Sequence, residues 1–184
     1  FQQTSEGYLS ADPDQVSNLR SKLMGEKYKK IVGLSWLGGT DKSTYLKQRN
    51  IDLISLVGTI ANDEIKFISL QHGDNFDEIR EVETQLGITI FEETSIDLFE
   101  DLGGLASLIC ACDQVVSSDN SVGLLAGSLG RSTHVLLPKY PNWKWIQTEN
   151  KSYWHSSVTT YHKDGLSNSK MQLERLKVNL DAQI

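Results

Sequence analysis

Cysteine and proline are scarce in this chain of 184 residues, which has two cysteines and three prolines. Cys110 and Cys112 stand two residues apart in an apolar segment, a spacing that disfavours a disulfide between them. Two thiols are too few for a structural zinc site, and the histidines add no metal-ligating spacing. We therefore expect buried, reduced thiols, no metal ion, no cofactor and a cytoplasmic protein.

The sequence also lacks long apolar runs and an excess of positive charge. No run approaches the roughly 20 apolar residues that cross a bilayer, and no basic start followed by an apolar segment marks a leader. Acidic residues outnumber basic ones by 24 to 18, which gives a formal net charge of -6. This balance argues against nucleic acid or an anionic membrane surface as a partner. An anionic ligand would therefore have to be held by a local group of residues.

The composition is that of an ordinary globular domain, with 39% hydrophobic and 23% charged residues. The length is enough to bury one sizeable core, so we expect one domain. Residues 1–28 are predicted to be a linker and an N-terminal helix, with Asp12 as cap and Pro13 at the first helical position. The sequence begins with Phe1 rather than methionine, which indicates processing or origin from a longer protein.

From Tyr28 onward, short apolar runs alternate with helical ones, as in β-α units around a parallel sheet. The apolar runs are continuous, which is typical of strands covered on both faces. The predicted fold class is α/β, a Rossmann-like parallel sheet of five or six strands with helices on both faces. Strands are predicted over residues 30–37, 65–70, 88–91, 114–118 and 133–137, with one more over 158–163. Helices are predicted over 50–61, 76–87, 97–112 and 167–183, and after residue 118.

Ligands of such sheets bind beyond the carboxyl ends of the strands, which selects the loops 38–43, 71–75, 91–95 and 118–123. In the last loop, Asp119, Asn120 and Ser121 are good helix-capping residues. The free N–H groups and the dipole of the following helix favour a phosphate at this point. The alternative is a plain cap, made by Asp119 or Asn120, before small residues that allow close packing.

The loop after the first strand has the same two interpretations. Gly38 and Gly39 could let the backbone approach a diphosphate, with Lys42 as a point charge. Lys47 or Arg49 could supply the cation instead. The pattern is neither G-x-G-x-x-G nor a P-loop, so a flexible turn is the alternative.

The segment QHGD follows the second strand. Gln71 offers a donor and an acceptor to a base or ribose, and Asp74 could accept from ribose hydroxyls. His72 is a candidate general base without an identifiable partner, so a surface or capping role is the alternative. Trp143, Trp145 and Trp154 are predicted to be core residues or interface anchors, with a stacking platform as the alternative.

Four segments in this order resemble the C-terminal half of GT-B glycosyltransferases. They are GLSWLGG, IKFISLQHGD, EDLGGLASLICACDQVVSSDNSVGLLAGSLG and HVLLPKYPNWKW, which begin at residues 33, 65, 100 and 134. The chain is most similar to tetratricopeptide-linked bacterial proteins related to the heptosyltransferases and to protein O-linked N-acetylglucosamine transferases. The resemblance covers roughly residues 29–165, most of the chain.

The resemblance implies that residues 29–184 form a donor-binding domain for a nucleotide-diphosphate sugar. It implies that a separate N-terminal or tetratricopeptide region holds the acceptor, and that nothing before residue 28 is long enough to be that region. The chain alone is then expected to bind donor with little or no turnover. Carried over to this sequence, the donor-binding residues are Asp119, Asn120, Ser121, Gln71, Asp74, Gly38, Gly39, Lys42, Arg49 and Asp101.

This sequence departs from the family pattern at three positions. Leu124 stands where relatives have a histidine, Asn120 where they have a threonine, and Gly104 where they have a second acid. A lost hydrogen bond to a charged group is worth about 1.5–3 kcal/mol, so the departures put donor affinity and turnover in doubt. The alternative function is a degenerate glycosyltransferase-like domain that acts as an interaction or structural module.

Overall fold

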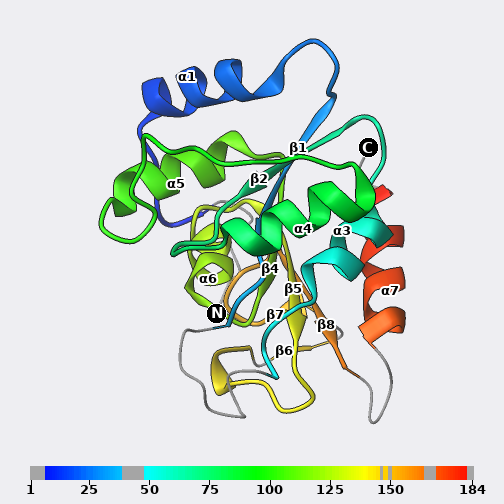
Figure 1. Cartoon of the computed structure of the whole chain (residues 1–184). Helices are drawn as coiled ribbons and strands as arrows, with labels where there is room; N and C mark the ends of the chain where they lie inside the picture. Colours follow the sequence, from blue (N-terminus) through cyan, green and yellow to red (C-terminus); the bar gives the residue numbers. More distant parts are fainter. Residues whose placement is uncertain (1–6, 39–47, 146, 149–150, 164–168, 182–184) are drawn as a thin grey trace.

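The computed structural model describes residues 7–38, 48–145, 147–148, 151–163 and 169–181. Its strands form one sheet in the order β3-β2-β1-β4-β5-β8-β7-β6 (Figure 1). The first six strands of this order are parallel, and β7 and β6 continue the sheet in antiparallel fashion. The strands are β1 (Lys30–Ser35), β2 (Ile65–Ser69), β3 (Ile90–Phe91), β4 (Gln114–Ser118), β5 (Ser132–Leu137), β6 (Gln147–Thr148), β7 (Lys151–Ser152) and β8 (Val158–His162).

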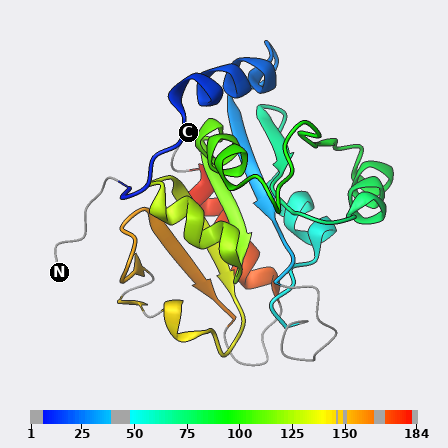
Figure 2. The ribbon, with the colours of Figure 1, turned by 90° about the vertical axis from the view of Figure 1, so that its left-hand side faces the viewer.

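Helices cover both faces of the sheet, which confirms the predicted Rossmann-like α/β class (Figure 2). One face carries α3 (Leu53–Ile60), α4 (Phe76–Leu86) and α7 (Ser169–Asp181). The other carries α1 (Pro13–Met24), α5 (Leu102–Ala111) and α6 (Ser121–Ser128). A short 3-10 helix, η1 (Trp143–Trp145), follows β5.

The two cores explain why the strands are apolar throughout rather than alternating. In β1, Val32 and Leu34 pack under α3, α4 and α7, whereas Ile31, just before them, packs on the other face under α1, α5 and α6. All six residues of β1 are buried. Successive side chains of a strand point to opposite faces, so a sheet covered on both faces needs apolar residues at every position.

The structure confirms the predicted start of α1 but not that of α5. Asp12 caps α1 through the N–H groups of Asp14 and Gln15, with Pro13 at the first helical position, as predicted. The helix predicted over 97–112 is wrong at its start, because α5 begins only at Leu102. Asp97 instead closes a separate turn by accepting from the N–H groups two and three residues further on.

The N-terminal segment is packed onto the rest of the fold. Leu9 donates its N–H to Ser128 O at 3.0 Å, and the Tyr8 hydroxyl lies 2.7 Å from Ser128 Oγ at the end of α6. Helix α1 packs against α5, and Arg20 on it pairs with Asp113 at 2.7 Å. The helix predicted within residues 1–28 therefore belongs to the same hydrophobic core as the sheet.

The cysteines and tryptophans fall into different environments. Cys112 is fully buried, where burial raises the pKa of its thiol to about 12, while Cys110 is half-buried. Of the three clustered tryptophans, Trp145 is a core residue, but Trp143 and Trp154 are exposed. Within the described ranges, no helix combines the length and the hydropathy that crossing a membrane requires.

A buried histidine lies beneath α7 at the β5–β8 pair. His134 Nδ1 is 2.9 Å from the hydroxyl of Tyr161, which accepts in turn from Asn179 Nδ2 at 2.8 Å. The imidazole thus has a hydrogen-bond partner at Nδ1, while its Nε2 is buried without one among the described residues. Burial, and to a smaller extent the positive charge of Lys30, lower the pKa of His134 to about 4.

Because His134 is buried with a lowered pKa, we expect the folded protein to lose stability in mild acid. Between pH 6.5 and 4 the unfolded chain binds a proton at His134 that the folded chain does not. The free energy of unfolding should therefore fall by up to about 3 kcal/mol across this window. Urea unfolding at about pH 7, 6 and 5 measures the slope.

His134→Gln is the matched variant, because the glutamine amide can donate to or accept from the Tyr161 hydroxyl but does not titrate. His155, whose pKa burial also lowers, remains in both proteins and cancels in the comparison. Equal slopes for the wild type and the variant would contradict the assignment.

Candidate functional site

A cavity opens at the carboxyl ends of β1 and β4, where the strand order reverses. We call it the switch-point cavity; its volume is about 390 Å³ including the space open to solvent. The reversal of strand order is where open α/β sheets bind ligands. The lining residues are Ser35, Leu37, Gly38, Arg49, Gln71, His72, Asn120, Ser121 and Val122.

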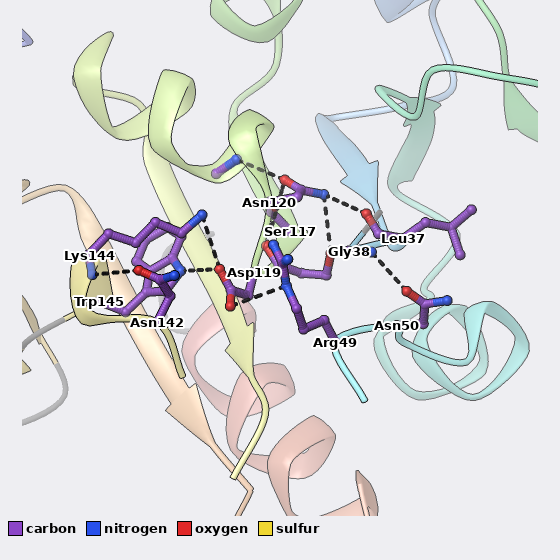
Figure 3. Close-up of polar contacts among 12 residues, drawn as sticks. Leu37, Gly38, Arg49, Asn50, Ser117, Asp119, Asn120, Asn142, Lys144 and Trp145 are labelled. Atoms are coloured by element: carbon purple, nitrogen blue, oxygen red, sulfur yellow. Dashed lines mark hydrogen bonds and ion pairs between the residues drawn. The ribbon is translucent and has the colours of Figure 1, made fainter. Parts of the chain in front are cut away.

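Asn120 is the N-cap of α6 and joins this helix to β1. Its Oδ1 accepts from the N–H groups of Val122 and Gly123 at 3.0 and 3.3 Å. Its Nδ2 donates to Ser35 Oγ at 2.8 Å and to Leu37 O at 3.1 Å (Figure 3). Of the two capping residues left open by the sequence, the cap is therefore Asn120 and not Asp119.

The cap leaves little of the helix N-terminus for a ligand. The N–H of Asn120 donates to Ser118 O, so three of the four N–H groups at the helix start have acceptors. Within the described residues the remaining group, the N–H of Ser121, has none. The Ser121 side chain is exposed and lines the cavity, so this residue offers an N–H and a hydroxyl there.

Arg49 brings a positive charge to the lining of the cavity. It comes from the turn before α3, and its side chain is 14% exposed. Gly38 lies directly against it, because a Cβ on this glycine would be 2.4 Å from Arg49 Cβ. Asn50 fixes the approach by accepting from the N–H of Gly38 at 2.9 Å. The close contact requires glycine at position 38.

Asp119, predicted as a donor contact, lies beneath the cavity and not on its wall. Its carboxylate is fully buried and turns toward η1 and Arg49 (Figure 3). Oδ1 accepts from the indole N–H of Trp145 at 2.5 Å and pairs with Lys144 Nζ at 3.2 Å. Oδ2 lies 3.2 Å from Arg49 Nε. The acid thus contacts two cations that approach from different segments of the chain.

A second, acidic cavity adjoins the first and shares Gln71 and His72 with it. Its volume is about 550 Å³ including open solvent, and it lies beyond the ends of β2 and β3. The exposed ring of Phe99 forms part of its wall, 5.4 Å from the His72 ring between centroids. The lining residues are Ser69, Gln71, His72, Gly73, Glu92, Glu93, Thr94, Ile96, Asp97, Leu98 and Phe99.

Glu93 is the buried acid of this second cavity. It pairs with Lys22 of α1 at 2.7 Å and accepts from the hydroxyl and N–H of Ser95. Burial raises the pKa of Glu93, but the hydrogen bonds from Lys22 and Ser95 together outweigh this and hold the pKa below its ordinary value. The carboxylate is therefore a charged acceptor at neutral pH.

The two polar residues predicted near a nucleoside lie in different places. Gln71 is buried between both cavities, where its Oε1 accepts from the N–H of Leu37 at 2.9 Å and from the Ser35 hydroxyl at 3.2 Å. Asp74 is exposed and outside both linings, and it accepts from the N–H of Phe76 at the start of α4. Gln71 thus joins β1 to β2 at the site.

Asp101 and the departures from the family pattern have structural explanations. Asp101 caps α5 by accepting from the N–H of Gly104 at 2.8 Å and lines neither cavity. A Cβ on Gly104 would lie 2.3 Å from Asp101 Oδ2, so an acid there would displace the cap. Leu124 packs in the apolar cluster around Trp145. Gly39, Lys42 and Lys47 lie outside the described residues.

Sequence reasoning did not assign Lys144 and Trp145 to the site. They lie about one hundred residues after Gly38 in the chain, and only the return of the chain after β5 brings η1 beside Asp119. The residue types alone were a clue to this contact, because a tryptophan next to a lysine can offer a buried acid both an N–H donor and a positive charge. Among the described residues, no three His, Cys, Asp or Glu side chains are arranged to hold a metal ion.

The chain is similar in sequence to a longer curated protein. Protein FlbA of Caulobacter vibrioides is 27% identical to it over 168 residues, which cover 82% of this chain and 27% of FlbA. No protein-family model matches the sequence.

Solved glycosyltransferase structures have the same fold at low identity. ADP-heptose lipopolysaccharide heptosyltransferase II of E. coli superposes with a TM-score of 0.61 at 11% identity, over 96% of this chain and 54% of that chain. E. coli heptosyltransferase WaaC, solved with ADP-2-deoxy-2-fluoro heptose, gives 0.58 at 13%, over 92% and 48%. The family 9 glycosyl transferase of Veillonella parvula gives 0.56 at 11%, over 95% and 46%. The chain therefore has the Rossmann-like glycosyltransferase fold and spans about half the length of these structures.

Proposed function

We propose that this chain binds the nucleotide-diphosphate sugar of a glycosyltransferase, with the diphosphate in the switch-point cavity. The observation that carries the proposal is that Arg49 and Ser121, at the N-terminus of α6, line the same cavity at the reversal of strand order. A guanidinium and a helix start both favour phosphate oxygens. The heptosyltransferase neighbours, one solved with an ADP-sugar analogue, support this class of ligand.

The nucleoside would occupy the acidic cavity. Its walls combine an exposed aromatic ring, Phe99, with the carboxylates of Glu92, Glu93 and Asp97. Carboxylates accept hydrogen bonds from ribose hydroxyls and base amino groups, and aromatic rings stack on bases. Gln71 and His72 stand at the junction, where the ribose would connect the base to the diphosphate.

The chemistry that this arrangement supplies is stabilisation of the leaving group. When the bond from the sugar to the diphosphate breaks, negative charge develops on the diphosphate. Arg49 and the N–H of Ser121 are positioned to stabilise that charge without a metal ion. The acceptor, and a base to deprotonate it, would come from another domain or from a tetratricopeptide region of a longer cytoplasmic protein.

A second function, an interaction or structural module, is favoured by one feature of α6. Asn120 already accepts from two N–H groups of the first turn, and Leu124 faces Trp145 where relatives have a histidine. This helix start therefore has fewer donors for an anion than an uncapped one. The module would fold in the same way and bind no nucleotide.

Titration with nucleoside diphosphates separates the two functions. We expect at least one of ADP, GDP and UDP to bind with a Kd of about 1 mM or tighter, and its parent nucleoside to bind more weakly because it lacks the diphosphate. Calorimetry or NMR shifts on the isolated chain measure both affinities. Absence of binding by all three, with the chain folded, would leave the structural module as the function.

Gly38→Ala tests whether the position of Arg49 matters. The added methyl group would lie 2.4 Å from Arg49 Cβ, so the arginine must move although no charge is lost. We expect the affinity for the bound nucleoside diphosphate to fall at least about tenfold, the loss of a hydrogen bond to a charged group.

Gly103→Ala is the matched control, because a Cβ there meets only Asp101 Oδ1 at an ordinary 3.6 Å. It should leave the affinity unchanged and stabilise α5 slightly through higher helix propensity. Equal affinities for the two variants would show that Arg49 is not a phosphate contact.

A further inference from the structure

Three charged side chains and one indole meet beside the switch-point cavity. Asp119 is fully buried and lies within 3.2 Å of Arg49 Nε on one oxygen and of Lys144 Nζ on the other. Trp145 donates its indole N–H to the same oxygen as Lys144 (Figure 3). We call Asp119, Arg49 and Lys144 the charge triad.

The triad carries one positive charge more than it needs for neutrality. A buried carboxylate requires compensation, and a single cation would supply it. Here Lys144 and Arg49 both do so, with side chains only 24% and 14% exposed. Because the two cations share one carboxylate, the triad has a net positive charge in a chain of net charge -6. An anionic ligand can neutralise this local charge.

The geometry makes Arg49 the member that meets the ligand. Arg49 lines the switch-point cavity, whereas Asp119 and Lys144 do not. Its ion pair with Asp119 runs through Nε, at the base of the guanidinium, and among the described residues no acceptor is paired with the Nη groups. Gly38 closes the other side of the arginine stem.

We infer that Asp119 is a positioning residue for the diphosphate, acting through Arg49 and never touching the donor. The carboxylate orients the guanidinium toward the cavity, and Lys144 neutralises the carboxylate so that Arg49 keeps its charge for the phosphate. A direct contact between Asp119 and the donor would set a buried anion against a diphosphate. This inference rests on the proposed function and adds how its phosphate site is assembled.

Asp119→Asn separates positioning from simple electrostatics by the sign of its effect. Asparagine has the same shape and can still accept from Trp145, but it removes a negative charge next to an anion site. Electrostatics alone would make anions bind more tightly. Positioning predicts that inorganic pyrophosphate, measured by calorimetry, binds about tenfold more weakly. Unchanged or tighter binding overturns the inference.

Lys144→Met is a second variant, which tests the inference independently if Asp119→Asn does not fold. It leaves Asp119 to neutralise Arg49 fully, so pyrophosphate affinity should fall several-fold. Lys139→Met is the matched control, because this lysine lies after the same strand, is exposed and pairs with the Tyr140 ring. Equal affinities for the two lysine variants overturn the inference.

A double-mutant cycle tests whether the effects pass through Arg49. In an Arg49→Met background, neither Asp119→Asn nor Lys144→Met should weaken pyrophosphate binding further, which a general loss of structure would do. Full additivity overturns the inference. If the wild type binds neither pyrophosphate nor any of the three nucleoside diphosphates, the proposed function fails; if it binds pyrophosphate and the variants do not differ, only the role of Asp119 fails.

Discussion

The site depends on the amide side chain of Asn120, which ties the end of β1 to the start of α6. One oxygen satisfies two N–H groups of the helix, while the nitrogen donates to Ser35 and to the carbonyl of Leu37. Because these groups are buried or half-buried, leaving them unpaired would cost about 1–3 kcal/mol each. The amide has both a donor and an acceptor end, which a carboxylate lacks, and so it can join a carbonyl to an N–H. This connection joins two elements that line the cavity.

The same loop also holds a buried charged residue, whose partners come from distant parts of the chain. Asp119, one residue earlier, is fully buried and pairs with both Arg49 and Lys144. Arg49 lies between β1 and α3, whereas Lys144 lies in η1, after β5. The acidic cavity next to it uses Lys22 of the N-terminal helix to hold Glu93. A buried acid paired with a lysine thus lies beneath the switch-point cavity, and another lines the acidic cavity. The result is a cavity with a cationic side chain beside an acidic one, which is the polarity on which the proposed function rests.

Much of the fold was predictable because it follows from local patterns. Continuous apolar runs indicated strands covered on both faces, and Asp12 before Pro13 marked the start of α1. For the site, the sequence predicted which loops lie near it but not which side chains line it. The four loops at strand ends include several of the lining residues, such as Gln71 and Asn120, but not Arg49 or Phe99. Sequence could not separate Asp119 from Asn120, since both are good caps. The late start of α5 was missed for the same reason, because Asp97 and Asp101 are equally suited to end a turn or begin a helix.

The sequence by itself determined the class of fold and the order of its parallel strands and main helices, but not η1 or the antiparallel strands β6 and β7. It also indicated the edge of the sheet at which the proposed ligand would bind. These depend on hydrophobic periodicity and on residue types within short segments. The tertiary structure decided which polar side chains line that edge and which lie beneath it. Asp119 turned inward because Trp145 and Lys144 reach it from a segment after β5, and Arg49 reached the cavity because Gly38 leaves room for it. Contacts between residues so distant in sequence depend on three-dimensional packing, which no local pattern encodes.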